Sequence, residues 1–331
     1  MSAYLGIDWG GTYIKAGIID SKGKILAKKV YSSSKLKESS FFISEIASLL
    51  DNFKKYKVKA IGIGAPGLVN IKKGSIYYLP NITGWKNFPL KRNLEKKVKI
   101  PVLVDNDANV FALAEARLGA GKGLSRAIFL TLGTGLGSSV IFDKQILRRK
   151  SSALELGHVP ISLEKNRCGC GNYGCIETFV GNGYLVKKYN KLVKKERSQR
   201  SKRSPERPTG ERSPELVEGR SRTTKGVEGV KDIYQRGLKG EKKAIYIWKE
   251  FSFYLGRFLA GMVNIFNPQA IILGGGVSGA YKLFRPYLIS VIKEQAMWPN
   301  LEGLKLYKAK LKNAGIIGAG LLAKEEMKKN S

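Results

Sequence analysis

The sequence predicts a two-domain α/β protein. Its 331 residues are enough for two domains and a sizeable core. Short apolar segments that end in Gly-rich turns alternate with segments whose apolar residues follow helical spacing, such as residues 39–54. The strand, Gly/Thr turn and strand of residues 4–19 also return at residues 127–142. This internal duplication is more informative than either hairpin alone.

Composition is typical of a soluble globular protein, with 43% hydrophobic residues. Apolar runs such as residues 127–142 are broken by Gly and Ser and fall short of the about 20 residues that span a bilayer, so we expect no membrane partner. The net charge of +33 comes largely from lysines scattered through the helical segments, which favours a solvated surface over a specific nucleic-acid site. The start lacks a basic leader, so we expect a cytoplasmic protein.

The first Gly-rich turn has the residues of a phosphate-binding hairpin. Gly10, Gly11 and Thr12 offer backbone N–H groups and a hydroxyl group to an anion. Asp8 ends the first strand, where a carboxylate can hold Mg²⁺ through water. A plain β-turn is the alternative, because hairpins with Gly-Gly at the tip are common. Three strands are expected here, at residues 3–8, 13–20 and 24–31.

Two further strand ends carry candidate ligands. The buried strand AIGIGAPGLV leads into a Pro-Gly turn at Gly67, and ligands favour the carboxyl ends of strands in open α/β sheets. In the next loop, Asn81 is either a turn residue or an amide that pairs with a hydroxyl group. The run PVLVDNDANV is a strand that passes through Asn106 and Asp107 into a helix. Asp107 is therefore either a helix N-cap or a well-placed general base.

Two more glycine turns suit a nucleotide. The second hairpin turn contains Gly133, Thr134 and Gly135, and two such hairpins facing each other would grip the phosphates from opposite sides. The strand AIILG ends in a triple-glycine turn that includes Gly274 and Gly275. Glycine there lets a flat ring or a ribose lie against the backbone, although one such turn is weak evidence by itself.

The segment 151–181 predicts a zinc site. It contains the only histidine and all three cysteines of the chain. Three thiolates and one imidazole form the closed tetrahedral set of structural zinc, whereas a disulfide would leave one cysteine unpaired. The weaker alternative is a Gly-rich turn with buried free thiols. Glu155 and Glu177 bracket the cluster, and a folded zinc loop would hold both in place. The predicted zinc ligands are His158, Cys168, Cys170 and Cys175.

Composition also divides the chain. A helix expected from about residue 182 to 195 is followed by residues 196–229, which are rich in Ser, Arg, Glu and Pro, repeat RSPE and contain almost no apolar residue. Such a segment cannot bury enough surface to fold, so we expect a disordered insertion. We assign residues 1–116 and 313–331 to a small N-terminal α/β domain. The larger domain, 117–312, carries the zinc loop at 158–175 and the insertion.

The ordered motifs DWGGT, VDNDAN, LGTGLG, ELGH, CGCGNYGCIE and LGGGVS resemble the ROK family of sugar kinases and related repressors. The resemblance covers essentially the whole chain apart from residues 196–229. It implies the two-domain actin-like (ribonuclease H-like) ATPase fold, with ATP, Mg²⁺ and Zn²⁺ as cofactors. It further implies a homodimer or homotetramer.

The resemblance also implies roles for the candidate residues. Asp107 would take a proton from the sugar hydroxyl group, and Gly274 and Gly275 would lie near adenosine. His158 would have one ring nitrogen on zinc and the other toward the sugar, since its two nitrogens are distinct. The phosphates would be surrounded by Asp8, Gly10, Gly11, Thr12, Gly133, Thr134 and Gly135. The sugar would be contacted by Gly67, Asn81, Asn106, Glu155, His158 and Glu177.

We expect ATP-dependent phosphorylation of a hexose primary hydroxyl group, most simply the 6-hydroxyl of glucose. Trp9, Asn70 and Leu154 depart from the usual family residues, which leaves the sugar open: N-acetylmannosamine and fructose are alternatives. A sugar-responsive repressor is the rival from another class. It is disfavoured because the hairpin is reached by residue 8, which leaves no room for an N-terminal helix-turn-helix domain.

Overall fold

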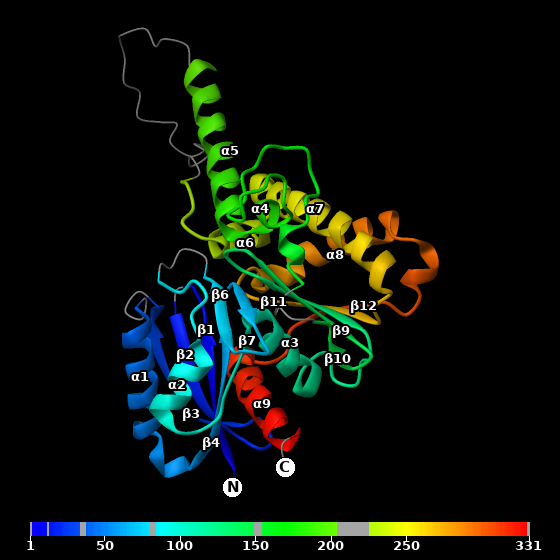
Figure 1. The fold of residues 1–331 in the computed structure, drawn as a ribbon. Helices are drawn as coiled ribbons and strands as arrows, with labels where there is room; N and C mark the ends of the chain where they lie inside the picture. The colour runs from blue at the N-terminus through cyan, green and yellow to red at the C-terminus, as the bar shows by residue number, and fades with distance from the viewer. Residues whose placement is uncertain are drawn as a thin grey trace, which may run out of the picture.

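Two five-stranded sheets form the framework of the protein (Figure 1). The structure is a computed structural model, and it describes residues 2–11, 13–33, 38–79, 84–148, 154–203 and 225–329. Within these residues, no helix is long and apolar enough to cross a membrane.

The first sheet has the strand order β3–β2–β1–β4–β7. Its first three strands form an antiparallel meander, while β4 runs parallel to both β1 and β7. The carboxyl ends of β1, β4 and β7 therefore meet at one edge, which is where ligands bind in sheets of this kind. The bounds are β1 Ala3–Trp9, β2 Tyr13–Asp20, β3 Ile25–Ser32, β4 Val58–Ala65 and β7 Val102–Asn106.

One face of this sheet is covered by α1 (Ser39–Asn52) and α2 (Leu90–Val98). Trp9 is fully buried there, with its ring 4.3 Å from that of Phe42 and 4.6 Å from that of Trp85, centroid to centroid. Trp9, one of the departures from the family pattern, is therefore a core residue. A small hairpin of β5 (Leu68–Asn70) and β6 (Ser75–Tyr78) follows β4.

The second sheet has the order β10–β9–β8–β11–β12. β8 and β9 form the second hairpin, and β11 runs parallel to β8 and β12. Its strands are β8 Ala127–Leu132, β9 Leu136–Phe142, β10 Gln145–Ile146, β11 Ala270–Gly274 and β12 Lys305–Lys308. Helices α4 (Glu177–Val180), α5 (Asn182–Arg203), α6 (Val230–Leu238), α7 (Lys242–Phe266) and α8 (Tyr281–Gln295) belong to this half.

Two helices, α3 (Asp107–Leu118) and α9 (Ala314–Lys329), pack against each other between the sheets (Figure 1). The approach of α9 to the first sheet is close: a Cβ atom at Gly62 would lie 1.8 Å from the carbonyl oxygen of Ala319, so only glycine fits. The chain thus returns to its first sheet at its carboxyl-terminal helix.

One buried carboxylate joins the two segments of chain that connect the sheets, one after α3 and one before α9. Glu115, near the end of α3, has no exposed surface. It accepts N–H donors from Ala120, after α3, and from Lys310 and Leu311, before α9, at 2.7, 3.0 and 2.7 Å. Three backbone N–H groups in these crossings are thereby satisfied inside the protein.

The expectation of disorder covers residues 196–229, and the described parts of this stretch are built into the fold. α5 continues to Arg203, and Glu196 pairs with Lys243 of α7. At the other end, Val227 is buried, and its N–H and carbonyl groups bond the side chain of Asn190 at 2.8 and 2.9 Å. Tertiary contacts, which composition does not reveal, hold these two ends. Residues 204–224 lie outside the described residues.

Candidate active site

Asp8 lies in a crowded corner at the end of β1. It stands opposite Lys15 in the β1–β2 register, with 3.7 Å between Lys15 Nζ and Asp8 Oδ2. The start of α9 meets the carboxyl group, since a Cβ atom at Gly315 would lie 2.3 Å from Asp8 Cγ. Burial raises the pKa of Asp8, and Lys15 opposes the rise. A carboxylate in this position suits a hydrated divalent cation.

The first hairpin turn is open to a ligand. The N–H group of Gly10 donates to the carbonyl of Tyr13 at 3.0 Å, and the hydroxyl of Ser33 donates to the carbonyl of Gly10 at 2.7 Å. Around Gly11, by contrast, no heavy atom lies within 4 Å of where a Cβ atom would be. These bonds fix the turn while leaving its tip free. Thr12 lies outside the described residues.

Asn106, and not Asp107, caps α3. The side-chain oxygen of Asn106 accepts the N–H of Ala108 at 2.9 Å, and its amide nitrogen donates to the carbonyl of Gly67 at 3.1 Å. Asn106 therefore joins the turn after β4 to the start of the helix. Gly67 has a φ of +74°, a backbone conformation that favours glycine. Asp107 is the first helical residue, and its Oδ1 atom also accepts the N–H of Ala108, at 2.8 Å. Asn81 lies outside the described residues.

Asp107 has two acidic neighbours, Asp8 and Glu155. Burial is the largest cause that raises the pKa of Asp107 to about 7, and the charges of Asp8 and Glu155 add to it. Burial also raises the pKa of Glu155, against the effect of nearby His158. A carboxyl group with a pKa near neutrality exchanges protons readily at physiological pH, which is the property of a general base.

The second hairpin turn is fixed by α5 and faces the triple-glycine turn. The N–H of Asn182, the first residue of α5, donates to the carbonyl of Gly133 at 2.9 Å, and the N–H of Gly133 donates to the carbonyl of Gly135 at 3.0 Å. Gly275 has a φ of +81°, and a Cβ atom there would lie 2.3 Å from the carbonyl oxygen of Leu132. The predicted phosphate and adenosine turns thus lie side by side. Thr134, at the tip of the second hairpin turn, is exposed.

The four predicted metal ligands come together. One ligand atom from each of them lies within 4.8 Å of the other three. The Sγ atoms of Cys170 and Cys175 are 3.8 Å apart, and His158 Nδ1 is 3.4 Å from Cys168 Sγ. A tetrahedron of sulfur atoms about 2.3 Å from zinc has edges of about 3.8 Å, and an edge to nitrogen is slightly shorter. The donor set and its spacing therefore fit zinc.

Both flanking glutamates contact this cluster. The Nε2 atom of His158 lies 4.0 Å from Glu155 Oε2, so the imidazole has one nitrogen toward the thiols and the other toward a carboxylate. Glu177 begins α4, and its Oε2 accepts the N–H of Leu136 at 3.1 Å, while its Oε1 lies 3.6 Å from Cys168 Sγ. Glu177 thus bridges the metal cluster and the second hairpin, a contact that the sequence did not suggest.

Sequence reasoning missed two cations and a carboxylate near the site. Lys15 could have been found from the pairing of β1 with β2, because this pairing places it directly opposite Asp8. Asp105 is 1% exposed and accepts the N–H of Asn106 at 2.7 Å. Its place in the motif VDNDAN was the only sequence signal that it belongs to the site. Arg148 pairs with Asp105 from 43 residues away, and no local pattern identifies such a partner.

Asn70, another departure from the family pattern, is held within the β5–β6 hairpin. Its amide nitrogen donates to the hydroxyl of Tyr77 at 2.6 Å, and its oxygen accepts the N–H of Lys73 at 3.0 Å. An amide both donates and accepts, which a carboxylate at this position does not.

Comparisons with known proteins agree with this geometry. The family model described as ROK family matches residues 4–326. The glucokinase of Streptomyces coelicolor is 35% identical over 98% of both chains, and the xylose repressor of Caldicellulosiruptor bescii is 29% identical over 96% of this chain and 76% of its own.

Among solved structures, a ROK family glucokinase from Streptomyces griseus in complex with glucose and AMPPNP matches with a TM-score of 0.79 and 30% identity, over 98% of this chain and 99% of its own. The expected actin-like ATPase fold is thereby confirmed. The motifs, the two hairpins beside Asp107 and the match over residues 4–326 together establish that the chain belongs to the ROK family.

Proposed function

We propose that the protein is an ATP-dependent hexose kinase that phosphorylates the 6-hydroxyl group of glucose. The observation that carries this proposal is the Asp107 carboxyl group, whose pKa is raised to about 7 beside Asp8 and Glu155. Support also comes from relatives named glucokinase and from the similar structure with glucose and AMPPNP. N-acetylmannosamine and fructose remain the alternative sugars.

In this proposal Asp107 accepts the proton of the attacking hydroxyl group while the γ-phosphoryl group moves in line onto that oxygen. A magnesium ion, when bound, neutralises phosphate charge, and Asp8 is the residue that would hold it through water. Asn106 positions the start of α3 by its bond to the Gly67 carbonyl. Catalysis then rests on positioning and charge neutralisation.

The nucleotide would lie between the two hairpins. The backbone N–H group of Gly11, with the Thr12 hydroxyl, would receive the phosphates from one side, while Gly10, whose own N–H bonds Tyr13, would shape the turn around them. The turn of Gly133, Thr134 and Gly135 would receive them from the other. Adenosine would lie along Gly274 and Gly275, of which Gly274 is buried against Phe111 and Gly275 is exposed.

Zinc would act as a scaffold in this site. Bound to the three thiolates and to His158 Nδ1, it would fix the loop that carries Glu155, and would leave Nε2 to face the sugar. Metal binding and loop folding are coupled in such sites. Cys170→Ser should therefore lower the zinc content, the affinity for glucose and the melting temperature together, as measured by metal analysis, kinetics and calorimetry. Unchanged metal content after replacement of all three cysteines would refute the site.

Asp107→Asn tests the proposed function directly. We expect kcat to fall by about 10³-fold or more, since the base is lost, while glucose binding by calorimetry stays nearly unchanged. ADP release should be measured over a panel of glucose, N-acetylmannosamine, fructose and mannose. Near-normal turnover in the variant would overturn the role of Asp107, and a preference for another sugar would replace glucose as the substrate.

The repressor alternative is supported by relatives such as the xylose repressor, about three quarters of which matches this chain. It predicts DNA binding that weakens steeply with salt, and no ATP turnover. A gel shift with operator DNA, run beside the ADP assay, separates the two functions.

We further propose that the protein works in the cytoplasm as two lobes, 1–116 with 313–331 and 117–312, that close on the substrates. Three thiols reserved for metal favour a reducing compartment. A homodimer or homotetramer is supported by exposed apolar side chains at the end of α7 and after α8, with Ile265, Met297 and Trp298 67%, 64% and 81% exposed. Light scattering of the protein and of Trp298→Glu tests the assembly.

A further inference from the structure

A buried ion pair connects the second sheet to the strand that carries the proposed base. Arg148 follows β10, and its Nη1 atom pairs with Oδ2 of Asp105, the residue before Asn106 in β7. The Asp105 side chain is 1% exposed, and that of Arg148 is 28% exposed. The pair therefore spans the two halves of the protein at the point where α3 begins.

Asp105 transmits this contact to the site. Its Oδ1 atom accepts the N–H of Asn106 at 2.7 Å and the side-chain amide of Asn109 at 2.8 Å. Asn106 in turn caps α3 and bonds Gly67. The Asp105 carboxylate thus holds Asn106, just before Asp107 at the end of the strand, and Asn109, two residues after Asp107 in the helix.

The same arginine lies next to the sugar and metal loop in the sequence. Glu155 is seven residues after Arg148, and His158 is ten residues after it. The ion pair with Asp105 fixes Arg148 itself relative to β7. Arg148 and Asp105 bond each other, Asn106 and Asn109, and not the Asp107 carboxyl group, so their effect on the base has to pass through its position.

Electrostatics favours the same role. Asp105 lies two residues before Asp107, which already has Asp8 and Glu155 as negatively charged neighbours. Burial raises the pKa of Asp105, and Arg148 is the largest influence that opposes this rise. Without Arg148, Asp105 would be either an uncompensated buried charge or a protonated group with altered hydrogen bonds.

We propose that Arg148 is a positioning residue of the kinase, which holds the Asn106–Asp107 corner in place across the two halves through Asp105. The inference rests on the proposed role of Asp107 as the base. Because Arg148 acts on the position of the base, its loss should reduce kcat more than it raises the KM for glucose.

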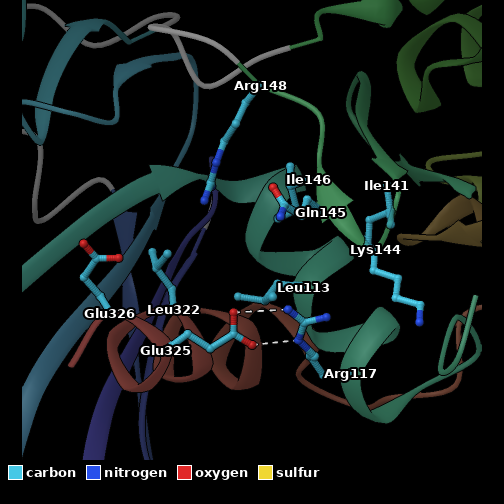
Figure 2. A pocket seen from close by; sticks show the side chains of 10 residues that line it. All are labelled: Leu113, Arg117, Ile141, Lys144, Gln145, Ile146, Arg148, Leu322, Glu325 and Glu326. Carbon is cyan, nitrogen blue, oxygen red and sulfur yellow. Dashed lines mark hydrogen bonds and ion pairs between the residues drawn. The ribbon is translucent and has the colours of Figure 1, made fainter. Parts of the chain in front are cut away.

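The structure offers a matched control. A pocket of about 500 Å³ between α3, α9 and the β9–β10 hairpin is lined by ten residues, including both Arg148 and Arg117 (Figure 2). Arg117 also makes an arginine–carboxylate pair, with Glu325 of α9 at 2.7 Å. This second pair joins α3 to α9, and among the described residues it makes no hydrogen bond or ion pair with β7, so its loss removes an ion pair of the same pocket while keeping the partners of Asp105.

The experiment compares Arg148→Gln, Arg148→Lys and Arg117→Gln by steady-state kinetics and thermal unfolding. We expect Arg148→Gln to lower kcat by about 10- to 100-fold, with the KM for glucose changed less than about 3-fold. Arg148→Lys keeps the charge and should recover at least about 3-fold of that loss, and Arg117→Gln should stay within about 2-fold of the unaltered protein. A kcat of Arg148→Gln within about 2-fold, or a lysine variant no better than glutamine, would overturn the proposal.

A folding defect is handled by a second variant. If Arg148→Gln does not fold, the double variant Arg148→Gln with Asp105→Asn leaves no unpaired buried charge and is expected to show the same loss of kcat. Normal turnover in the double variant would contradict the proposal. Asp107→Asn separates the two hypotheses. Activity in that variant refutes the role of Asp107 as the base. An inactive Asp107→Asn together with a normal Arg148→Gln refutes only the positioning role of Arg148.

Discussion

Replacing Asp107 with asparagine tests the crowding of negative charge without measuring the reaction. In the folded protein, burial and then the charges of Asp8 and Glu155 raise the pKa of Asp107 from 3.8 to about 7. In the unfolded chain the group returns to about 3.9. Folding therefore takes up a proton between these values. The stability that this group contributes is fully present below about pH 3.9 and is lost progressively as the pH rises from there to about 7.

The size of the effect follows from the same pKa values. At about 1.4 kcal/mol for each tenfold change in the proton equilibrium, the difference corresponds to about 4 kcal/mol. Asp107 is partly exposed, so screening by solvent reduces this amount. We expect Asp107→Asn to exceed the unaltered protein in free energy of unfolding by about 2 kcal/mol at pH 8, and by about 0.7 kcal/mol at pH 5, where the group is neutral in the folded protein but already ionised in the unfolded chain.

Urea denaturation followed by circular dichroism from pH 5 to pH 8 measures this gain. Asp51→Asn is the control, because Asp51 is exposed on α1 and its replacement removes the same charge away from the site, so its effect on the free energy of unfolding should be small. An Asp107→Asn gain that is equal at both ends of the range, or absent at pH 8, would refute the convergence of carboxylates described here.

Three other predictions concern the nucleotide turn at Gly275, the buried carboxylate of Glu115 and the pH dependence of kcat/KM. Gly275→Ala puts a side chain at a φ of +81° against the Leu132 carbonyl, so it should lower the melting temperature and raise the KM for ATP by about 10-fold or more, whereas Gly279→Ala, with open space around it, should do neither. Glu115→Ala leaves three N–H groups without their acceptor and should cost about 3 kcal/mol or more in urea denaturation, and a cost under about 1 kcal/mol would contradict that role. The rate kcat/KM should fall as the pH drops below about 7, because Asp107 is then protonated, and a flat profile down to pH 5 would exclude it as the base.

Periodicity and residue chemistry predicted much of this protein. The strands around the first hairpin, the long α7 and the small-residue α9 lie where alternation and helical spacing put them. The metal cluster was predictable because the chain has no other histidine or cysteine, so the ligands did not have to be chosen from a larger set.

Contacts between distant residues could not be predicted in this way. The Arg148–Asp105 pair and the acceptance of Leu311 N–H by Glu115 join residues 43 and 196 positions apart, and neither leaves a local pattern. Local chemistry was ambiguous at the start of α3, where Asn106 and Asp107 are both good N-caps and only the folded geometry selects Asn106.

The bonds between Asn190 and Val227 have a practical consequence for handling the protein. They join α5 to the backbone just before α6, so this contact is expected to persist when the number of residues between Arg203 and Lys225 is changed. The entropy of closing a loop grows only slowly with its length. A fluorescent reporter or an affinity anchor inserted between these two held ends should therefore leave turnover intact.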